Sequence, residues 1–175
     1  MYPIIRLVKE FIKFRNAPDL GPLDTHVSTH ICWPWDIDPW MELNNGRTLT
    51  LYDLSRLPLA KRTGLIKVLR AKQWGLTMAG ASVRYRRRVR AFQKVEIRSR
   101  FVCWDEKFLY LEQSMWRNGE AASHILYRAA VTDKGGMIPS SRVIEALPYE
   151  TEAPEIPDWI NVWIAAESYR PWPPL

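Results

Sequence analysis

The hydrophobic pattern changes period near Met78, and this change constrains the fold more than any other feature of the sequence. Downstream of it, apolar and polar residues alternate along four successive segments, which is typical of half-buried β-strands. Only Arg90-Ala91, Asp105-Glu106 and Asn118-Gly119 separate the segments, and the last pair is a strong hairpin signal. Connections this short predict antiparallel neighbours and hence a four-stranded meander. The predicted strands cover residues 78–90, 91–104, 107–116 and 120–132.

One further strand is predicted upstream, over residues 25–33. Its apolar side chains, including Val27 and Ile31, fall on one parity, and His26 and His30 fall on the other. We interpret the two histidines as ordinary surface or edge residues. A pair four apart on a strand is too separated to chelate one ion without other ligands.

A long helix is predicted between these strands, beginning at Asn45. Its apolar positions recur at spacings of three and four as far as Leu57, where Pro58 breaks or restarts the helix. A second helical run follows over residues 59–73. The predicted order is a strand, a long helix and four further strands. The simplest way to bury the apolar faces of these elements is to wrap the sheet around the helix. The sequence therefore predicts an α+β fold, in which a five-stranded antiparallel sheet wraps around a long central helix.

The segment over residues 3–15 is predicted to be a basic amphipathic helix. Such a helix packs most often on its own domain, and the alternative is peripheral contact with an anionic membrane surface. A connector over residues 16–24 follows, so the N-terminal part is predicted to span residues 1–24. The predicted apolar face carries Ile4, Leu7, Val8, Phe11 and Ile12.

The wrapped domain is predicted to span residues 25–147 and to end in a short helix after Pro139. Residues 148–175 contain several prolines, and we expect them to be extended and irregular. Three tryptophans indicate that this C-terminal part lies on the domain and is not free in solution. They are Trp159, Trp163 and Trp172.

Composition narrows the possible partners and compartments. The formal net charge of +6 favours an anionic partner, and basic residues crowd between Arg84 and Arg100. No segment has the roughly 18 uninterrupted apolar residues of a spanning helix, so no transmembrane segment is expected. Cys32 and Cys103 set no disulfide framework and belong to no close cluster with histidine. They indicate a reducing, cytoplasmic compartment and no metal site.

The loop over residues 35–47 carries the strongest functional signal in the chain. It holds the carboxylates of Asp36 and Asp38 and runs into two asparagines and a glycine at the predicted helix start. The first turn of a helix leaves backbone N–H groups without partners. A carboxylate beside such donors suits acyl transfer, because one group attacks or activates water while the others hold the oxyanion. The simpler interpretation is an ordinary capped helix after a polar loop.

These features together resemble the 4-hydroxybenzoyl-CoA thioesterase-like superfamily, whose pattern runs Asp-x-Asp-x-x-Gly-His-x-Asn-Asn-x-x-Tyr. The resemblance covers about residues 25–140 and implies a hotdog fold, hydrolysis of an acyl-CoA thioester, and a homodimer or homotetramer. It implies no cofactor beyond the coenzyme A of the substrate. The chain departs from the pattern at Met41-Glu42, in place of Gly-His, and at Thr48, in place of Tyr. The matching residues are Asp36, Asp38, Asn44 and Asn45, followed by Asp53 and Arg56 later in the helix.

The resemblance also implies roles for individual residues. Asp38 stands at the position of the catalytic carboxylate, which attacks the thioester carbonyl or activates water. The main-chain N–H of Asn45, with that of Gly46, would hold the thioester oxygen. Asp53 is a second catalytic candidate, because another hotdog branch places its carboxylate on the helix, about two turns after the oxyanion donor. Its alternative role is an ion pair with Arg56.

Substrate binding is predicted from basic and aromatic residues. Arg86 and Arg88 are candidates for the phosphates of CoA, because guanidinium groups bind phosphate bidentately. Within a strand only part of this basic run would form one patch, and a solvated sheet edge is the competing interpretation. Glu42, at the family's His position, is a weaker third catalytic candidate. The predicted substrate-binding residues are Asn44, Gly46, Trp40, Leu49, Tyr52, Arg86 and Arg88, with Trp104 as a further acyl-pocket candidate.

Two other classes of function stay open on the sequence. One is a non-catalytic acyl-CoA-binding hotdog protein, and the other is a basic nucleic-acid-binding module, which ranks lowest, so no nucleic acid is expected as a partner. A hotdog dehydratase is disfavoured, since those enzymes use a His–Glu or His–Asp pair and the loop contains no histidine.

Overall fold

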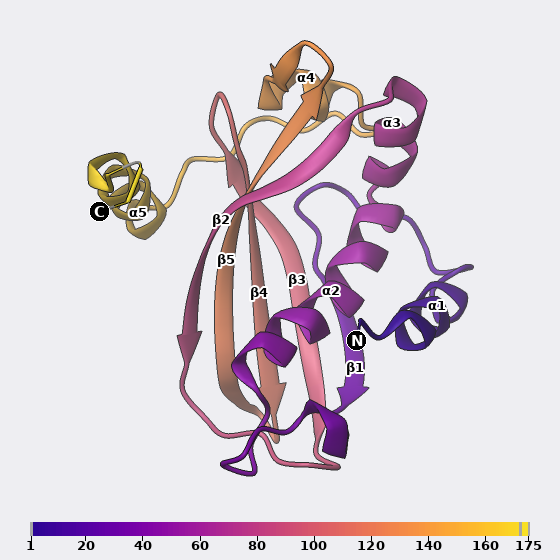
Figure 1. The fold of residues 1–175 in the computed structure, drawn as a ribbon. Coiled ribbons are helices and arrows are strands. Elements are labelled where there is room, and N and C mark those ends of the chain that lie inside the picture. Colours follow the sequence, from indigo (N-terminus) through magenta and orange to yellow (C-terminus); the bar gives the residue numbers. More distant parts are fainter. Residues whose placement is uncertain (1, 172, 175) are drawn as a thin grey trace.

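The β-sheet is strongly curved, and helix α2 crosses its concave face (Figure 1). The computed structural model describes residues 2–171, 173 and 174, so Trp172 lies outside the described residues. The strand order is β1-β3-β4-β5-β2, with a short β6 beside β5 and every pair antiparallel. The predicted α+β fold is confirmed, with six strands where five were expected. The strands are β1 His26–Ile31, β2 Gly75–Tyr85, β3 Lys94–Trp104, β4 Leu109–Arg117, β5 Glu120–Asp133 and β6 Gly136–Ile138. The helices are α1 Ile4–Lys13, α2 Asn45–Arg62, α3 Leu65–Lys72, α4 Ser140–Glu145 and α5 Asp158–Tyr169, with a 3-10 turn η1 at Pro34–Asp36.

Helix α2 is fixed on the sheet by buried apolar side chains and by a line of buried polar groups. The Ser99 hydroxyl donates to the Ser55 hydroxyl at 2.8 Å. The Gln113 amide donates to the Ser99 hydroxyl at 2.6 Å and to the Tyr52 carbonyl oxygen at 2.9 Å. Because a buried polar group without a partner costs about 1–3 kcal/mol, this network defines the rotation of α2. The first turn of the helix is thereby held at a defined place beside the sheet.

Strand β2 pairs with β5 and not with β3, so the predicted meander holds only for β3, β4 and β5. The strand also ends earlier than predicted, at Tyr85, and residues 86–93 cross the lower end of the sheet to reach β3 (Figure 1). The N–H groups of Arg86 and Arg87 both donate to the Ala122 carbonyl oxygen, at 2.8 and 3.0 Å. This double contact turns the chain out of the ladder.

The helix break falls at Gly64 and not at Pro58, which corrects the predicted helix boundary. Helix α2 continues through Pro58, whose ring is buried in the core. Gly64 has a φ of +79°, a conformation that glycine adopts without the strain that a Cβ imposes. Pro58 removes one backbone donor from the helix without ending it.

The inward face of β1 carries its polar side chains, which reverses the predicted parity. His26 and His30 are 0% and 5% exposed, so their interpretation as surface residues is wrong. The His26 ring packs edge-on against Phe14, with centroids 4.5 Å apart, and its Nδ1 lies 3.0 Å from an Arg62 nitrogen. The His30 ring bonds with the Ser28 hydroxyl at 2.8 Å. Local alternation could not show this, because Phe14 and Arg62 come from distant segments.

The two buried histidines are expected to make the protein less stable in acid. Burial lowers the pKa of His26 to about 4 and that of His30 to about 3, below the unfolded value of 6.5. The unfolded chain therefore takes up protons first as the pH falls below 6.5, and stability is lost from there down to the folded pKa values. Each histidine contributes a loss of up to about 1.4 kcal/mol per pH unit in this window. Urea unfolding at pH 7 and pH 5 measures the effect, and equal stability at both pH values would contradict it.

Helix α1 packs on α2, but with a different face from the predicted one. Leu7 and Phe11 are partly buried, as expected. Ile4, Val8 and Ile12 are exposed, whereas Glu10 is 4% exposed. The amphipathic pattern therefore predicted the helix correctly and its apolar face wrongly, since the α1 face toward α2 is partly polar.

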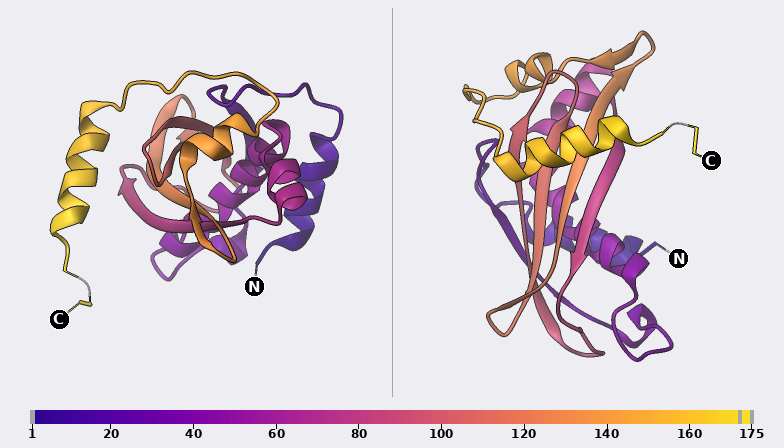
Figure 2. Two further views of the ribbon diagram at one scale, coloured as in Figure 1. Left: turned by 90° about the horizontal axis from the view of Figure 1, so that it is seen from above. Right: turned by 90° about the vertical axis from the view of Figure 1, so that its left-hand side faces the viewer.

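The C-terminal part forms a helix, α5, where irregular chain was predicted. Figure 2 shows α5 crossing the outer face of the sheet, on the side opposite α2. Ile160 is fully buried there, and the Trp163 ring meets Tyr110 edge-on, with centroids 6.3 Å apart. The signal for this helix was the spacing of Ile160, Trp163 and Ile164 after Pro157, because proline is favoured at helix starts.

Candidate active site

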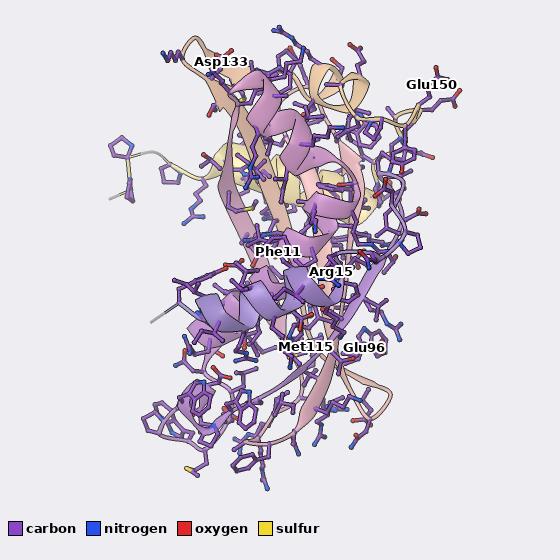
Figure 3. The ribbon with its side chains drawn as sticks, turned by 90° about the vertical axis from the view of Figure 1, so that its right-hand side faces the viewer. Phe11, Arg15, Glu96, Met115, Asp133 and Glu150 are labelled. Atoms are coloured by element: carbon purple, nitrogen blue, oxygen red, sulfur yellow. The ribbon has the colours of Figure 1, made fainter. Side chains whose placement is uncertain are left out.

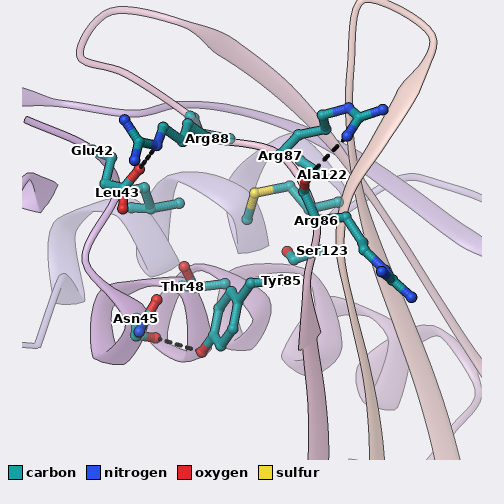
Figure 4. Close-up of a pocket in the computed structure, with 12 residues that line it drawn as sticks. Glu42, Leu43, Asn45, Thr48, Tyr85, Arg86, Arg87, Arg88, Ala122 and Ser123 are labelled. Carbon is teal, nitrogen blue, oxygen red and sulfur yellow. Dashed lines mark hydrogen bonds and ion pairs between the residues drawn. The ribbon is translucent and has the colours of Figure 1, made fainter.

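A pocket of about 210 Å³ lies between the first turn of α2 and the segment that leaves β2 (Figure 4). Asn45 and Thr48 form the helix side of this pocket, and residues 86–88 form the other side. The sheet contributes Met115 and Ser123, and the Ser123 hydroxyl bonds with the buried Tyr52 hydroxyl at 2.8 Å. The pocket is lined by Glu42, Leu43, Asn45, Thr48, Tyr85, Arg86, Arg87, Arg88, Val89, Met115, Ala122 and Ser123.

The first turn of α2 presents backbone donors at this pocket. Asn44 caps the helix, since its side-chain oxygen accepts from the Arg47 N–H at 3.1 Å and its own N–H donates to the Asp36 carbonyl oxygen at 2.9 Å. Among the described residues, no acceptor binds the N–H groups of Asn45 and Gly46. Both groups point out of the helix start, where the dipole adds partial positive charge. Unbonded N–H groups of this kind are the donors that an oxyanion site uses, and Asn45 is among the residues that line the pocket.

Three consecutive arginines line the other side of the pocket. Arg86, Arg87 and Arg88 follow the end of β2 and line this pocket, whereas Arg84 and Arg90 line other pockets, so only part of the basic run shares a patch, as expected. Arg88 forms an ion pair with Glu42 at 2.9 Å, and Arg87 forms a longer one with Glu120 at 3.5 Å. All three side chains are exposed, so their guanidinium groups can meet an anionic ligand.

Asp38 lies in the turn before α2 and does not itself line the pocket. Its Oδ1 accepts from the Trp40 N–H at 2.9 Å, and its backbone N–H donates to the Glu42 carbonyl oxygen at 2.9 Å. Within the described part of the chain, Oδ2 accepts no hydrogen bond. One oxygen therefore fixes the carboxylate in the turn and the other is available.

Met41 stands where the family pattern has glycine, and its backbone adopts a conformation that glycine favours. Its φ is +61°, in the left-handed region that side chains other than Asn and Asp rarely adopt. The side chain is exposed, so packing does not explain the residue. The Gly-to-Met change thus leaves the turn in the left-handed conformation and strains it.

Replacement of Met41 by glycine is expected to stabilise the protein by up to about 1 kcal/mol. Glycine removes the Cβ clash at positive φ, and this gain is reduced by the larger entropy of glycine in the unfolded chain. Urea unfolding of Met41→Gly measures the change. A loss of stability of similar size would show that the turn is not strained.

Asp36 is the buried anchor of the loop, a role that the sequence did not reveal. Its side chain is 1% exposed and forms ion pairs with Arg6 at 2.8 Å and Arg47 at 3.1 Å. It also accepts from the Trp33 N–H at 3.0 Å. Asp36 therefore connects helix α1, the turn η1 and the first turn of α2.

Asp53 belongs to α2 but is not among the residues that line the pocket. It is ion-paired with Arg56. Partial burial raises the pKa of its carboxyl. The Arg56 guanidinium lies 4.4 Å from the centre of the Tyr127 ring, so both members of the pair are held by packing.

Most of the predicted acyl-pocket residues lie elsewhere. Tyr52 is fully buried under α2, Leu49 packs partly into the core, and Trp104 is buried in the core. Trp40 is exposed at the tip of the loop. Thr48, Tyr85, Met115 and Ser123 line the pocket instead, and only Thr48 was singled out from the sequence, as a departure from the pattern.

The described residues form neither a cluster of metal ligands nor a helix able to cross a membrane. No group of three or more His, Cys, Asp or Glu residues in that part of the chain comes together as metal ligands would. Within the same part, every helix is too short or too polar to cross a membrane.

Comparison with known sequences identifies the family. The thioesterase-like superfamily matches residues 32–164, so the chain belongs to this superfamily. Protein THEM6 of Xenopus laevis is 31% identical over 144 residues, which cover 81% of this chain and 68% of that protein. Protein THEM6 of Drosophila melanogaster is 30% identical over 147 residues, covering 82% and 74%. A probable thioesterase of Saccharomyces cerevisiae is 28% identical over 90 residues, covering 51% and 37%.

Solved structures share the fold at low sequence identity. The probable thioesterase YbaW of Escherichia coli has a TM-score of 0.65 at 15% identity and covers 69% of this chain and 93% of its own. A DHNA-CoA thioesterase of Staphylococcus aureus has a TM-score of 0.61 at 13% identity, covering 82% and 91%. A Thermus thermophilus thioesterase complexed with coenzyme A and zinc has a TM-score of 0.60 at 22% identity, covering 69% and 94%. The predicted hotdog fold and family are confirmed, and the family supports thioester hydrolysis as the class of activity.

Proposed function

We propose that the protein is an acyl-CoA thioesterase whose active site is the pocket at the start of α2. One observation carries this proposal: Asn45, whose N–H is unbonded at the helix start, lines the same pocket as three consecutive arginines. The N–H groups suit the oxyanion of a thioester, and the guanidinium groups suit the phosphates of CoA. A single acyl-CoA lying across the pocket would use both.

Asp38 is the proposed catalytic carboxylate. Its bond to the Trp40 N–H orients the side chain, and Oδ2 is left to act as nucleophile or as the base that deprotonates water. Addition to the thioester carbonyl gives an oxyanion held by the N–H groups of Asn45 and Gly46, and cleavage of the C–S bond then releases the CoA thiolate. If the carboxylate itself adds, water hydrolyses the mixed anhydride and restores Asp38. The proposal uses no metal and no cofactor beyond the CoA of the substrate.

A homodimer or homotetramer is the proposed assembly. Strand β2 spans Gly75–Tyr85 at one edge of the sheet, and its outer edge pairs with no strand of the described residues. An exposed edge of this length is a template for pairing with a second copy. Tyr85, at the end of this strand, lines the pocket, so a copy paired there would lie beside the site.

A non-catalytic acyl-CoA-binding protein is the second candidate, and Glu42 favours it. Glu42 replaces the His of the family pattern and pairs with Arg88, one of the arginines proposed to meet CoA. The ion pair reduces the positive charge available there and removes an imidazole from the pocket. Nucleic acid is not a proposed partner, because the arginines surround a pocket and do not extend along one face.

The reducing cytoplasm is the proposed compartment. Cys32 and Cys103 are free thiols in the protein interior, and burial raises the pKa of each to about 11. Buried thiols that are not paired by a disulfide fit a compartment that keeps cysteines reduced.

A panel of acyl-CoAs with a free-thiol reagent tests the proposed function. Release of CoA thiol that saturates with at least one acyl-CoA is the expected result. Binding of CoA without thiol release from any member of the panel would replace the enzyme with the acyl-CoA-binding protein. Salt-sensitive binding to DNA or RNA, with no affinity for CoA, would contradict both.

A further inference from the structure

Helix α1 directs a stripe of large apolar side chains into solvent. Ile4, Ile5, Val8 and Ile12 are 64, 87, 49 and 59% exposed. Their spacing places them side by side on one face of the helix. Single exposed apolar residues are ordinary, but a contiguous patch marks a surface that is covered in use.

Specific hydrogen bonds and buried side chains hold α1 in its orientation on the rest of the domain. Arg6 donates to the Asp36 carboxylate at 2.8 Å and to the Ile31 carbonyl oxygen at 2.9 Å. Glu10 is buried on the side toward the body, and Leu7 is partly buried there. The face of α1 toward the protein thus mixes Arg6 and Glu10 with apolar residues such as Leu7, while most of its aliphatic side chains are turned outward, unlike those of an ordinary surface helix.

The exposed side of α1 carries only positive charge. Lys9 and Lys13 follow the apolar stripe along one flank of the helix, and Arg15 lies just beyond its end, all three exposed. Glu10 is the only acidic residue among residues 1–15, and it is buried. Apolar residues bordered by lysines and arginines match the interface of an anionic lipid layer, where the alkyl stems of lysine lie along the apolar surface and the ammonium groups reach phosphate.

Exposed aromatic residues lie beside this helix. The Arg6–Asp36 ion pair joins α1 to the turn η1, whose Trp35 is 64% exposed. Trp35 stacks on Trp33 with ring centroids 5.3 Å apart, and the exposed Phe92 meets Trp33 edge-on at 6.2 Å. Figure 3, where Phe11 is labelled on α1, shows this helix in front of the body, with the loops of the lower end beneath it. Tryptophan at such a position is typical of the membrane–water interface.

We propose that the exposed face of α1, together with the aromatic turn η1, docks on an anionic lipid surface. A second copy of the chain fits this face less well. A twofold contact would bring the patch against itself and place Lys9 and Lys13 opposite the same residues, with no exposed acid on the helix to pair with them. A lipid surface rich in phosphate supplies the complementary charge over the whole face.

Vesicle cosedimentation of the full chain tests this proposal, using phosphatidylcholine vesicles with and without phosphatidylglycerol. The wild type is expected to bind the vesicles that contain phosphatidylglycerol. The variant Ile5→Glu/Val8→Glu is expected to bind at least about tenfold more weakly, because two apolar side chains no longer leave water. Lys9→Glu/Lys13→Glu should abolish the preference for phosphatidylglycerol, since each basic residue contributes about 1 kcal/mol near an anionic surface.

Val162→Glu is the matched control, since Val162 is a similar apolar residue, 69% exposed, on α5. It should bind vesicles as the wild type does, and circular dichroism should show the same fold in every variant. Failure of the wild type to bind, or equal binding by Ile5→Glu/Val8→Glu, would overturn the proposal. An oligomer that Ile5→Glu/Val8→Glu dissociates, in a chain that does not bind vesicles, would show instead that a second copy covers the face.

Discussion

Replacement of Asp38 by asparagine is expected to lower kcat/KM for acyl-CoA hydrolysis by about 10²–10⁴-fold. Asparagine keeps an oxygen that accepts from the Trp40 N–H, so the turn before α2 is preserved. It removes the negative charge at Oδ2, which the proposed reaction needs for attack on the thioester or for proton transfer from water. Thiol release measured over a range of acyl-CoA concentrations gives kcat and KM separately, and the loss should fall mainly on kcat.

Asp53→Asn is the matched control for this experiment. Asp53 is also a partly buried carboxylate, but it lies in the middle of α2 and is ion-paired with Arg56. We expect this variant to keep activity within about threefold of the wild type. The opposite pattern, with activity lost in Asp53→Asn and kept in Asp38→Asn, would move the catalytic carboxylate onto the helix.

Replacement of Asp36 by alanine is expected to lower the free energy of unfolding by about 3–5 kcal/mol. The side chain is 1% exposed, and the substitution leaves the partly buried cations of Arg6 and Arg47 without its carboxylate. It also removes the acceptor of the Trp33 N–H. For a chain of this size the loss corresponds to a decrease in Tm of roughly 6–20 °C. Urea and thermal unfolding measure both quantities.

Glu96→Ala is the comparison for Asp36→Ala. Glu96 forms an ion pair with Arg98 at 2.7 Å, but both side chains are about half exposed. Solvent-exposed pairs contribute up to about 1 kcal/mol, so this variant should be close to the wild type. An equally small effect of Asp36→Ala would show that the loop is not anchored through this carboxylate.

The sheet, the central helix and the loop could be predicted from the sequence, because each depends on residues a few positions apart. The period of two from Met78 onward and the asparagine cap before Asn45 are local signals, and the structure contains both features. The pairing of β2 with β5 depends on how the sheet curves around α2, which no local spacing encodes. The short connection after β2 therefore predicted the wrong neighbour.

The residues whose burial or role was not predicted correctly depend on contacts between distant segments. His26 lies four residues from His30 in an apparently amphipathic strand, and only the packing of Phe14 and Arg62 shows that this face is the buried one. Asp36 matched the family pattern without an assigned role, because its partner Arg6 comes from another helix. Arg87 lines the same pocket as Arg86 and Arg88 because β2 ends at Tyr85 and the side chains no longer alternate between two faces.

The most direct test of the proposed site is the binding of a non-hydrolysable acyl-CoA thioether, followed by amide chemical shifts of the ¹⁵N-labelled protein. If the pocket holds the substrate as proposed, the largest changes will occur at the N–H groups of Asn45 and Gly46 and of Arg86, Arg87 and Arg88. Changes confined to the middle of α2 around Asp53, or to α5 on the outer face of the sheet, would contradict the account.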